Sequence, residues 1–206
     1  AVVATQSNLD LGNITAASLA VTSGTVSGGT ITNSGIITVS GITNLTAGNA
    51  TTPQNITLTN NSNNFGTVNI TRGNNVSLYD SNAITLGAAT TAGNFNITTN
   101  NGIITVTGIN NLSGTGSYNA GTGSLVVNNL MTVNTNNNAL SITASDINLG
   151  TTGTLNSGTA DTNITANNTI GLGTTAGTMT LNNSEIQRIT ANNLIKCKNT
   201  AIPQGI

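Results

Sequence analysis

The feature that most constrains the fold is a series of short segments in which apolar and small polar residues alternate. It is clearest between Phe65 and Gly108, where five such segments follow one another and Gly or Asn occurs in each gap. Alternation with a period of two is typical of strands that have one buried and one exposed face. The segments recur roughly every 8 to 12 residues, with no helical pattern between them. The sequence therefore predicts an all-β fold made of many short strands.

Internal repeats indicate how these strands are arranged. Residues 35–46 recur with conservative changes at 102–113, and the Leu86-Gly87 segment recurs at Leu172-Gly173. The first offset is about 67 residues, which is close to three steps of the 23 residues between Leu149 and Leu172. Self-similarity at 20 to 25 residues is typical of a solenoid. We therefore expect a parallel β-helix with coils of about 20 to 23 residues.

The composition excludes several functional classes. Charged residues make up 4% of the chain, against roughly 25% in an ordinary globular protein. The hydrophobic fraction is 36% and evenly spaced, whereas a disordered chain is poor in such residues. A net charge of −1 offers no electrostatic basis for binding nucleic acid or an anionic membrane. No apolar run approaches the length of about 18 residues that a membrane-spanning helix needs. Ala1–Ala4 is too short for a signal-peptide core, so we expect any export signal to lie upstream or to have been removed.

Asn and Pro indicate the corners between strands. Asn tolerates the left-handed backbone region and bonds to nearby backbone, so Asn-Asn pairs suit tight corners. We expect them to stack in ladders between coils. Pro53 predicts a loop over residues 50–54, because a central strand cannot accept proline. The pairs that we assign to corners are Asn74-Asn75, Asn110-Asn111, Asn128-Asn129 and Asn192-Asn193.

The C-terminal residues depart from the repeat pattern. Glu185, Arg188, Lys196 and Lys198 lie there, in a chain that has only four basic residues. We expect residues 1–183 to form the β-helix shaft, and residues 184–206 to form a terminal coil, a cap or a connection between subunits.

Short repeat motifs occur at residues 63–68, 74–78, 84–87 and 185–191. They resemble the repeats of bacterial filamentous haemagglutinin-like exoproteins, which are secreted through a two-partner system. The resemblance runs from about Leu9 to Ile195 and implies a right-handed parallel β-helix shaft. It also implies secretion through an outer-membrane partner and a role in adhesion or biofilm formation. The family's secretion domain carries Asn-Pro motifs, and this sequence has none, so the resemblance is to the shaft alone.

The residues offer little basis for catalysis or metal binding. There is no His, and sugar-cleaving chemistry needs clustered carboxylates. The carboxylates are scattered, although a pair such as Asp146 and Asp161 could meet across neighbouring coils. We therefore predict no enzyme, no catalytic residue, no cofactor and no metal site. Cys197 is the only cysteine, so it is either an incidental free thiol or the site of an intermolecular bridge.

Two recurring triplets suggest other functions. Thr-x-Thr raises the possibility of ice binding, but the triplets at Thr57, Thr105 and Thr178 do not recur at a constant coil spacing. Asn-x-Ser/Thr triplets are N-glycosylation acceptors in secreted proteins, although alternation between Asn and Thr produces them as well. The candidate acceptors are Asn13, Asn55, Asn69, Asn96 and Asn163.

Together these observations predict a structural or adhesive extracellular fibre segment that serves surface attachment or a biofilm matrix. A solenoid has unpaired backbone at each open end, so we expect head-to-tail self-association. A receptor on a host or neighbouring cell would be a further partner, and the expected location is extracellular or at the cell surface. The alternatives are a glycosylated self-assembling surface filament subunit, and an ice-binding or carbohydrate-binding β-helix.

Overall fold

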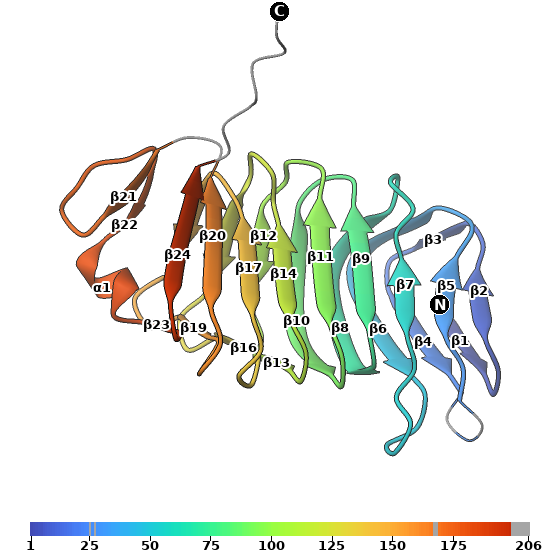
Figure 1. The fold of residues 1–206 in the computed structure, drawn as a ribbon. Helices are drawn as coiled ribbons and strands as arrows, with labels where there is room; N and C mark the ends of the chain where they lie inside the picture. Colours follow the sequence, from blue (N-terminus) through green and yellow to red (C-terminus); the bar gives the residue numbers. More distant parts are fainter. Residues whose placement is uncertain (25, 27, 167–168, 199–206) are drawn as a thin grey trace, which may run out of the picture.

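The computed structural model is a β-solenoid of parallel strands with almost no helix (Figure 1). The structure describes residues 1–206 with two exceptions. These are the whole of residues 25, 27, 167–168 and 199–206, and the side chains of residues 197 and 198. The predicted all-β parallel β-helix is confirmed. Alternation sets this fold, because each strand buries every second residue in a shared interior.

One side of the solenoid is a nine-stranded parallel sheet, which faces the viewer in Figure 1. Its strands run upward while successive coils advance from right to left, so the winding is right-handed. Paired positions in this sheet lie 19 to 25 residues apart as far as Thr162, close to the predicted coil length. The final step, from Thr162 to Leu194, is 32 residues. The strands are β2 (Leu9–Leu11), β5 (Ile31–Asn33), β7 (Ile56–Leu58), β9 (Val76–Asp80), β11 (Phe95–Thr99), β14 (Gly116–Asn119), β17 (Leu140–Thr143), β20 (Thr162–Ala166) and β24 (Leu194–Lys198).

The rest of each coil forms a 13-stranded sheet that bends along its length into two ladders. The long strands β6, β8 and β10 run round the bend, so β6 pairs with β3 near its start and with β4 near its end. In later coils separate short strands replace the long ones. The strands are β1 (Val2–Thr5), β3 (Ile14–Ala16), β4 (Leu19–Ser23), β6 (Ile37–Ala47), β8 (Asn64–Gly73), β10 (Ile84–Thr91), β12 (Ile104–Val106), β13 (Asn110–Leu112), β15 (Ser124–Val127), β16 (Thr132–Asn134), β18 (Asp146–Asn148), β19 (Thr154–Asn156) and β23 (Ile189–Thr190).

The sequence repeats match this stacking in one case and not in the other. Three steps of the first ladder, β6 to β8 to β10 to β12, separate the two copies of the repeat at residues 35–46 and 102–113. The 23-residue interval from Leu149 to Leu172 is not a coil step, contrary to our expectation. Leu172 lies on β21 (Ile170–Leu172), which pairs with β22 (Met179–Leu181), and β22 packs next to β18.

The interior is narrow and filled mainly by Ile, Leu and Val. Three of the four aromatic residues, Phe65, Phe95 and Tyr118, are also buried there. The rings of Phe95 and Tyr118 lie on adjacent strands with their centroids 5.8 Å apart. The four-residue helix α1 (Asn183–Ile186) lies at the C-terminal end of the stack, beside β22 and before β23 (Figure 1).

Candidate functional site

The outward positions of the nine-stranded sheet form the most regular surface of the molecule, which we call the nine-strand face. On each strand from β9 to β20 two side chains point outward, and they are in register with those of the adjacent strands. The first column extends further, through Thr57 on β7 and Thr32 on β5 to Asp10 on β2. From β7 to β20 the outward residues are uncharged and, with one exception, small. They are Thr57, Ser77, Asn96, Ser117, Ser141 and Asn163 in one column, and Tyr79, Thr98, Asn119, Thr143 and Thr165 in the other.

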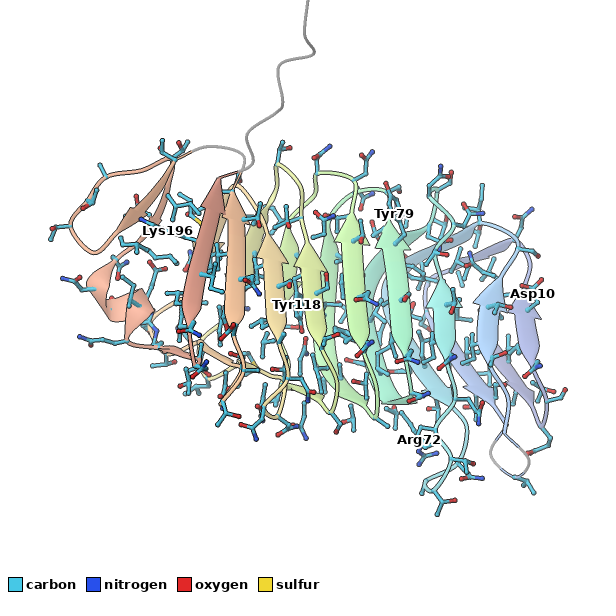
Figure 2. The ribbon with its side chains drawn as sticks, viewed as in Figure 1. Asp10, Arg72, Tyr79, Tyr118 and Lys196 are labelled. Atoms are coloured by element: carbon cyan, nitrogen blue, oxygen red, sulfur yellow. The ribbon has the colours of Figure 1, made fainter. Side chains whose placement is uncertain are left out.

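Tyr79 is the exception on this face (Figure 2). It is half-buried, whereas the other three aromatic residues of the chain are buried. Its neighbour Asp80 points inward and accepts hydrogen bonds from the backbone N–H groups of Phe65, at 2.6 Å, and Asn82, at 2.8 Å. These bonds fix the backbone directly after Tyr79. Sequence reasoning missed Tyr79, and the signal that could have found it is its place in the alternation of Val76, Leu78 and Asp80.

Asn side chains at the corner before the nine-stranded sheet hold successive coils together. The side-chain oxygen of Asn55 accepts a hydrogen bond from the backbone N–H of Asn75. In the same way, the side-chain oxygen of Asn75 accepts from the N–H of Asn94, and the side-chain oxygen of Asn94 accepts from the N–H of Thr115. These distances lie between 2.9 and 3.1 Å. The Asn ladder that we expected at Asn74-Asn75 is therefore present, and it serves the structure of the coil.

The Asn110-Asn111 pair does not lie at a corner, contrary to our expectation. Asn110 is on β13 and fully buried. Its amide donates to the carbonyl of Gly87 at 2.9 Å, and its side-chain oxygen accepts from the hydroxyl of Tyr118 at 3.0 Å. Burial raises the pKa of Tyr118. This pair is a satisfied interior contact and offers no access to a ligand.

Asp146 and Asp161, the example of a carboxylate pair that could meet, lie at different sheets. Asp146 lies on β18 of the 13-stranded sheet. Burial raises the pKa of its carboxyl, and the nearby charge of Glu185 raises it further by a smaller amount. Asp161 lies before β20 on the other sheet, where the amides of Asn192 and Asn193 donate to it at 3.2 and 2.9 Å. Among the described residues no group of three or more His, Cys, Asp or Glu side chains could hold a metal ion.

The remaining acidic residues have local partners. Asp10 accepts hydrogen bonds from the hydroxyls of Ser34 and Thr32, and the bond from Ser34 lowers its pKa most. Glu185 is buried, and its two oxygens accept from the backbone N–H groups of Leu149 and Asn182 at 3.3 and 3.1 Å. Its contact with Asn182 closes a capping box at the start of α1. Glu185 therefore ties this helix to the preceding coil.

Two shallow hollows lie at the corners of the solenoid. One of about 380 Å³ is lined by residues of β15 and by Asn128, Asn129, Asn148 and Gly150. Another of about 250 Å³ includes Arg72 and lies beside the loop that holds Pro53. The loop predicted over residues 50–54 is confirmed, because β6 ends at Ala47 and β7 begins at Ile56. Arg72 donates to the carbonyl of Gly48 at 3.1 Å. Neither hollow brings together an acid and a base that could share a proton.

The two ends of the solenoid differ in chemistry. At the N-terminal end the inward side chains of Val3, Leu9 and Ile14 are only partly buried. At the C-terminal end Lys196 pairs with the buried Ile164, so it occupies an inward position, and it is exposed (Figure 2). Arg188 ties this end to the preceding coil by donating to the carbonyls of Gly153 and Gly150 at 3.1 and 2.9 Å. The residues expected to form a terminal coil, cap or connection thus include β23 and β24, while residues 199–206 lie outside the described part.

The candidate glycosylation residues occupy different environments. Asn96 is exposed on β11 and points outward, and Asn163 lies in the same column on β20. The oxygens of Asn13 and Asn55 accept backbone N–H bonds from the next coil, and the amide of Asn69 donates to Asn44. Glycosylation of these residues stays a prediction. The side chain of Cys197 lies outside the described part.

Comparison with known proteins places the chain among repeat proteins. No helix in the described part is both long and apolar enough to cross a membrane. Neither the curated proteins nor the solved structures contain a match. The model of one family, described as repeats of unknown function (DUF5649), matches residues 1–71 and 73–140, which is more than half of the chain. Both matched segments lie within the stacked coils, and the chain belongs to this family of DUF5649 repeats.

Proposed function

We propose that this chain is a structural or adhesive segment of an extracellular fibre, with the β-solenoid as its shaft and no enzymatic activity. The observation that carries the proposal is the stack of parallel coils, which has an outer surface almost without charge and an apolar edge at its N-terminal end. A long rod with an inert surface suits attachment at a distance from the cell. The shaft-like repeats that resemble haemagglutinin-type exoproteins support the same role.

The edges of the first coil support self-association, which we propose as part of this function. β1, β2 and β3 each pair with the next coil on one side only. Their second edge offers backbone N–H and C=O groups to another strand. The partly buried Val3, Leu9 and Ile14 lie beside these groups and would gain burial if a further coil stacked on them. We therefore propose head-to-tail stacking in which this end meets the C-terminal end of another copy.

Two single substitutions in the first coil test the stacking. Leu9→Lys places a charge at an inward position of β2, whereas Thr15→Lys adds the same charge at an exposed position of β3. Sedimentation velocity and negative-stain microscopy of the wild-type chain should show rods longer than one solenoid. Leu9→Lys should leave single rods, because an inward charge blocks pairing at an edge, and Thr15→Lys should behave as wild type. Wild-type rods that remain single at high concentration would contradict the stacking.

The extracellular location has its own test. Antibody labelling of intact, unpermeabilised cells that make the protein should stain their surface. External protease should remove that signal and spare a cytoplasmic marker. Labelling only after permeabilisation would argue against an extracellular fibre.

A glycosylated filament subunit is a second candidate, favoured by Asn96. This acceptor is exposed on a flat face, and within the described part its side chain makes no hydrogen bond. Intact-mass measurement of the natively secreted protein should show added glycan mass that Asn96→Gln removes. Asn69→Gln is the comparison, because the Asn69 amide is engaged with Asn44. An unmodified mass would exclude the glycosylated subunit and favour the unglycosylated fibre segment.

A further inference from the structure

The nine-strand face has the geometry of a binding surface for an extended polymer. Its outward side chains repeat about every 4.8 Å along the solenoid axis and roughly 6.6 Å along each strand. The first of these spacings is comparable to the length of one sugar ring. The strict Thr-x-Thr pattern does not recur, but the two outward positions do recur from β9 to β20, with Ser and Asn in place of Thr on several strands.

The polar side chains at the centre of this face are available for hydrogen bonds to a ligand. Within the described part, the side chains of Ser77, Asn96 and Thr98 make no hydrogen bond to the protein. The corner amides of Asn55, Asn75 and Asn94 are instead used in bonds to the next coil. Hydroxyl and amide groups that both donate and accept suit the hydroxyls of a sugar.

Tyr79 adds an aromatic surface to these polar groups. Its backbone pairs with that of Thr98, and Ser77 lies on the same strand and on the same face. An aromatic ring combines apolar contact area with a polar hydroxyl, and a tyrosine has few rotatable bonds to immobilise on binding. The backbone bonds to Asp80 hold the strand beneath the ring in place.

The charge of the face selects one class of polymer. From Thr32 on β5 to Asn163 on β20, the column that includes Ser77 and Asn96 has no charged residue. The adjoining column, from Tyr79 to Thr165, also lacks charge. Recognition of sulfated or uronic-acid polymers relies on Arg and Lys. A neutral polymer needs no Arg or Lys side chain for its recognition. Its binding to this face also requires no charged group to be desolvated.

We propose that the nine-strand face binds a neutral polysaccharide that lies along the solenoid axis. One sugar ring stacks on Tyr79, while Ser77, Asn96 and Thr98 exchange hydrogen bonds with the hydroxyls of the same and the next ring. The site is separate from the coil ends, so it stands whether or not the chain forms a filament.

Depletion assays with insoluble polysaccharides test this proposal. The full chain is mixed with microcrystalline cellulose, with chitin and with heparin-coated beads, and unbound protein is measured. We expect binding to at least one neutral polymer. Tyr79→Ala should weaken that binding about ten-fold, as loss of one stacking contact implies. Tyr79→Phe should retain most of it, and Asn96→Ala should weaken it several-fold.

Thr85→Ala is the matched control, because Thr85 points outward on β10, in a column without an aromatic residue. Thermal unfolding of each variant shows whether the fold is intact. Equal binding by wild type and Tyr79→Ala would overturn the proposal, as would binding to heparin alone. Ice-recrystallisation inhibition without polysaccharide binding would also overturn it. Sedimentation of Tyr79→Ala should be unchanged, which separates this site from the proposed stacking.

Discussion

Single residues at the corners take backbone conformations that depend on the coil next to them. Asn101 and Gly121 both have positive φ, and the side-chain oxygen of Asn101 accepts from the N–H of Thr122 on the following coil. A Cβ at Gly121 would lie 2.4 Å from that oxygen. Gly121 is therefore needed for two reasons, its left-handed backbone and the space that Asn101 occupies.

Gly121→Ala should destabilise the protein by about 1–3 kcal/mol, because it adds both strain and a clash. Gly12→Ala is the control, since no atom lies within 4 Å of a Cβ placed there and its φ is not positive. Urea denaturation of the two variants measures the difference. Equal midpoints would contradict this account of the corner.

Asp80 is a second residue whose environment sets a measurable property. Burial raises the pKa of its carboxyl, although the N–H groups of Phe65 and Asn82 act in the opposite direction. Because the folded pKa lies above the unfolded value, the native state binds the proton more readily. The contribution of Asp80 to stability is thus fully present below the unfolded pKa, and it is lost as the pH rises through the folded pKa.

The free energy of unfolding of wild type minus that of Asp80→Asn should fall as the pH rises from about 3 to 7. Asp10→Asn should give a difference of the opposite slope, because the pKa of Asp10 is lowered, chiefly by its bond to Ser34. Chemical denaturation across this pH range measures both differences. A flat difference for Asp80 would show that its burial does not affect its titration.

At the scale of elements, neighbouring strands on different sheets are joined inside the coil. Tyr118 on β14 donates to Asn110 on β13, and Asn110 donates to the carbonyl of Gly87 on β10. The contact therefore links the nine-stranded sheet to two strands of the 13-stranded sheet. Buried polar groups of this kind are costly when one partner is removed.

Tyr118→Phe should cost about 1–3 kcal/mol, because it leaves the buried oxygen of Asn110 without a donor. Tyr79→Phe should change stability by about 0.5 kcal/mol or less, since Tyr79 is at the surface and its hydroxyl has no partner within the described part. Guanidinium denaturation compares the two. A double variant with Asn110→Ala should lose less than the sum of the single changes; additive losses would mean that the two side chains are not coupled.

Individual residues show why the elements could be predicted and the interior contacts could not. Alternation marks β8 to β12, because a period of two leaves only one buried face for each strand. The sequence predicts a corner at Asn110, because the sequence pattern of an Asn-Asn pair does not distinguish a corner from an inward position. Its partner Tyr118 lies on another sheet, where spacing along the chain gives no sign of contact. The 23-residue spacing predicts Leu172 one coil after Leu149, but β22 packs beside β18 in place of β21. No local sequence pattern indicates that order.

At the scale of the whole molecule, the two ends differ in how readily they accept another coil. The N-terminal edge is apolar, but Lys196 brings an ammonium to an inward position of the last strand of the nine-stranded sheet. Inward-pointing charges are a known way in which proteins limit pairing at a sheet edge. In the proposed head-to-tail contact, Lys196 therefore keeps the association weak.

Lys196→Ile should strengthen end-to-end association, because the ammonium no longer has to be desolvated on stacking. We expect the association constant to rise about ten-fold or more, which corresponds to about 1.4 kcal/mol. Thr165→Ile, an outward change on the adjacent strand, is the control. Sedimentation equilibrium measures both. Unchanged association of Lys196→Ile would place the contact elsewhere.

The direction of the hydrogen bonds has a mechanical consequence. The bonds between coils run along the axis, so tension applied along the shaft acts on every coil boundary in series, and a terminal coil, which pairs on one side only, can detach before the others. Each coil that detaches releases 19 to 25 residues over most of the stack. At about 3.4 Å per extended residue this is roughly 70 Å of added length per step. A shaft built in this way would yield under load in small, repeated extensions rather than by a single rupture.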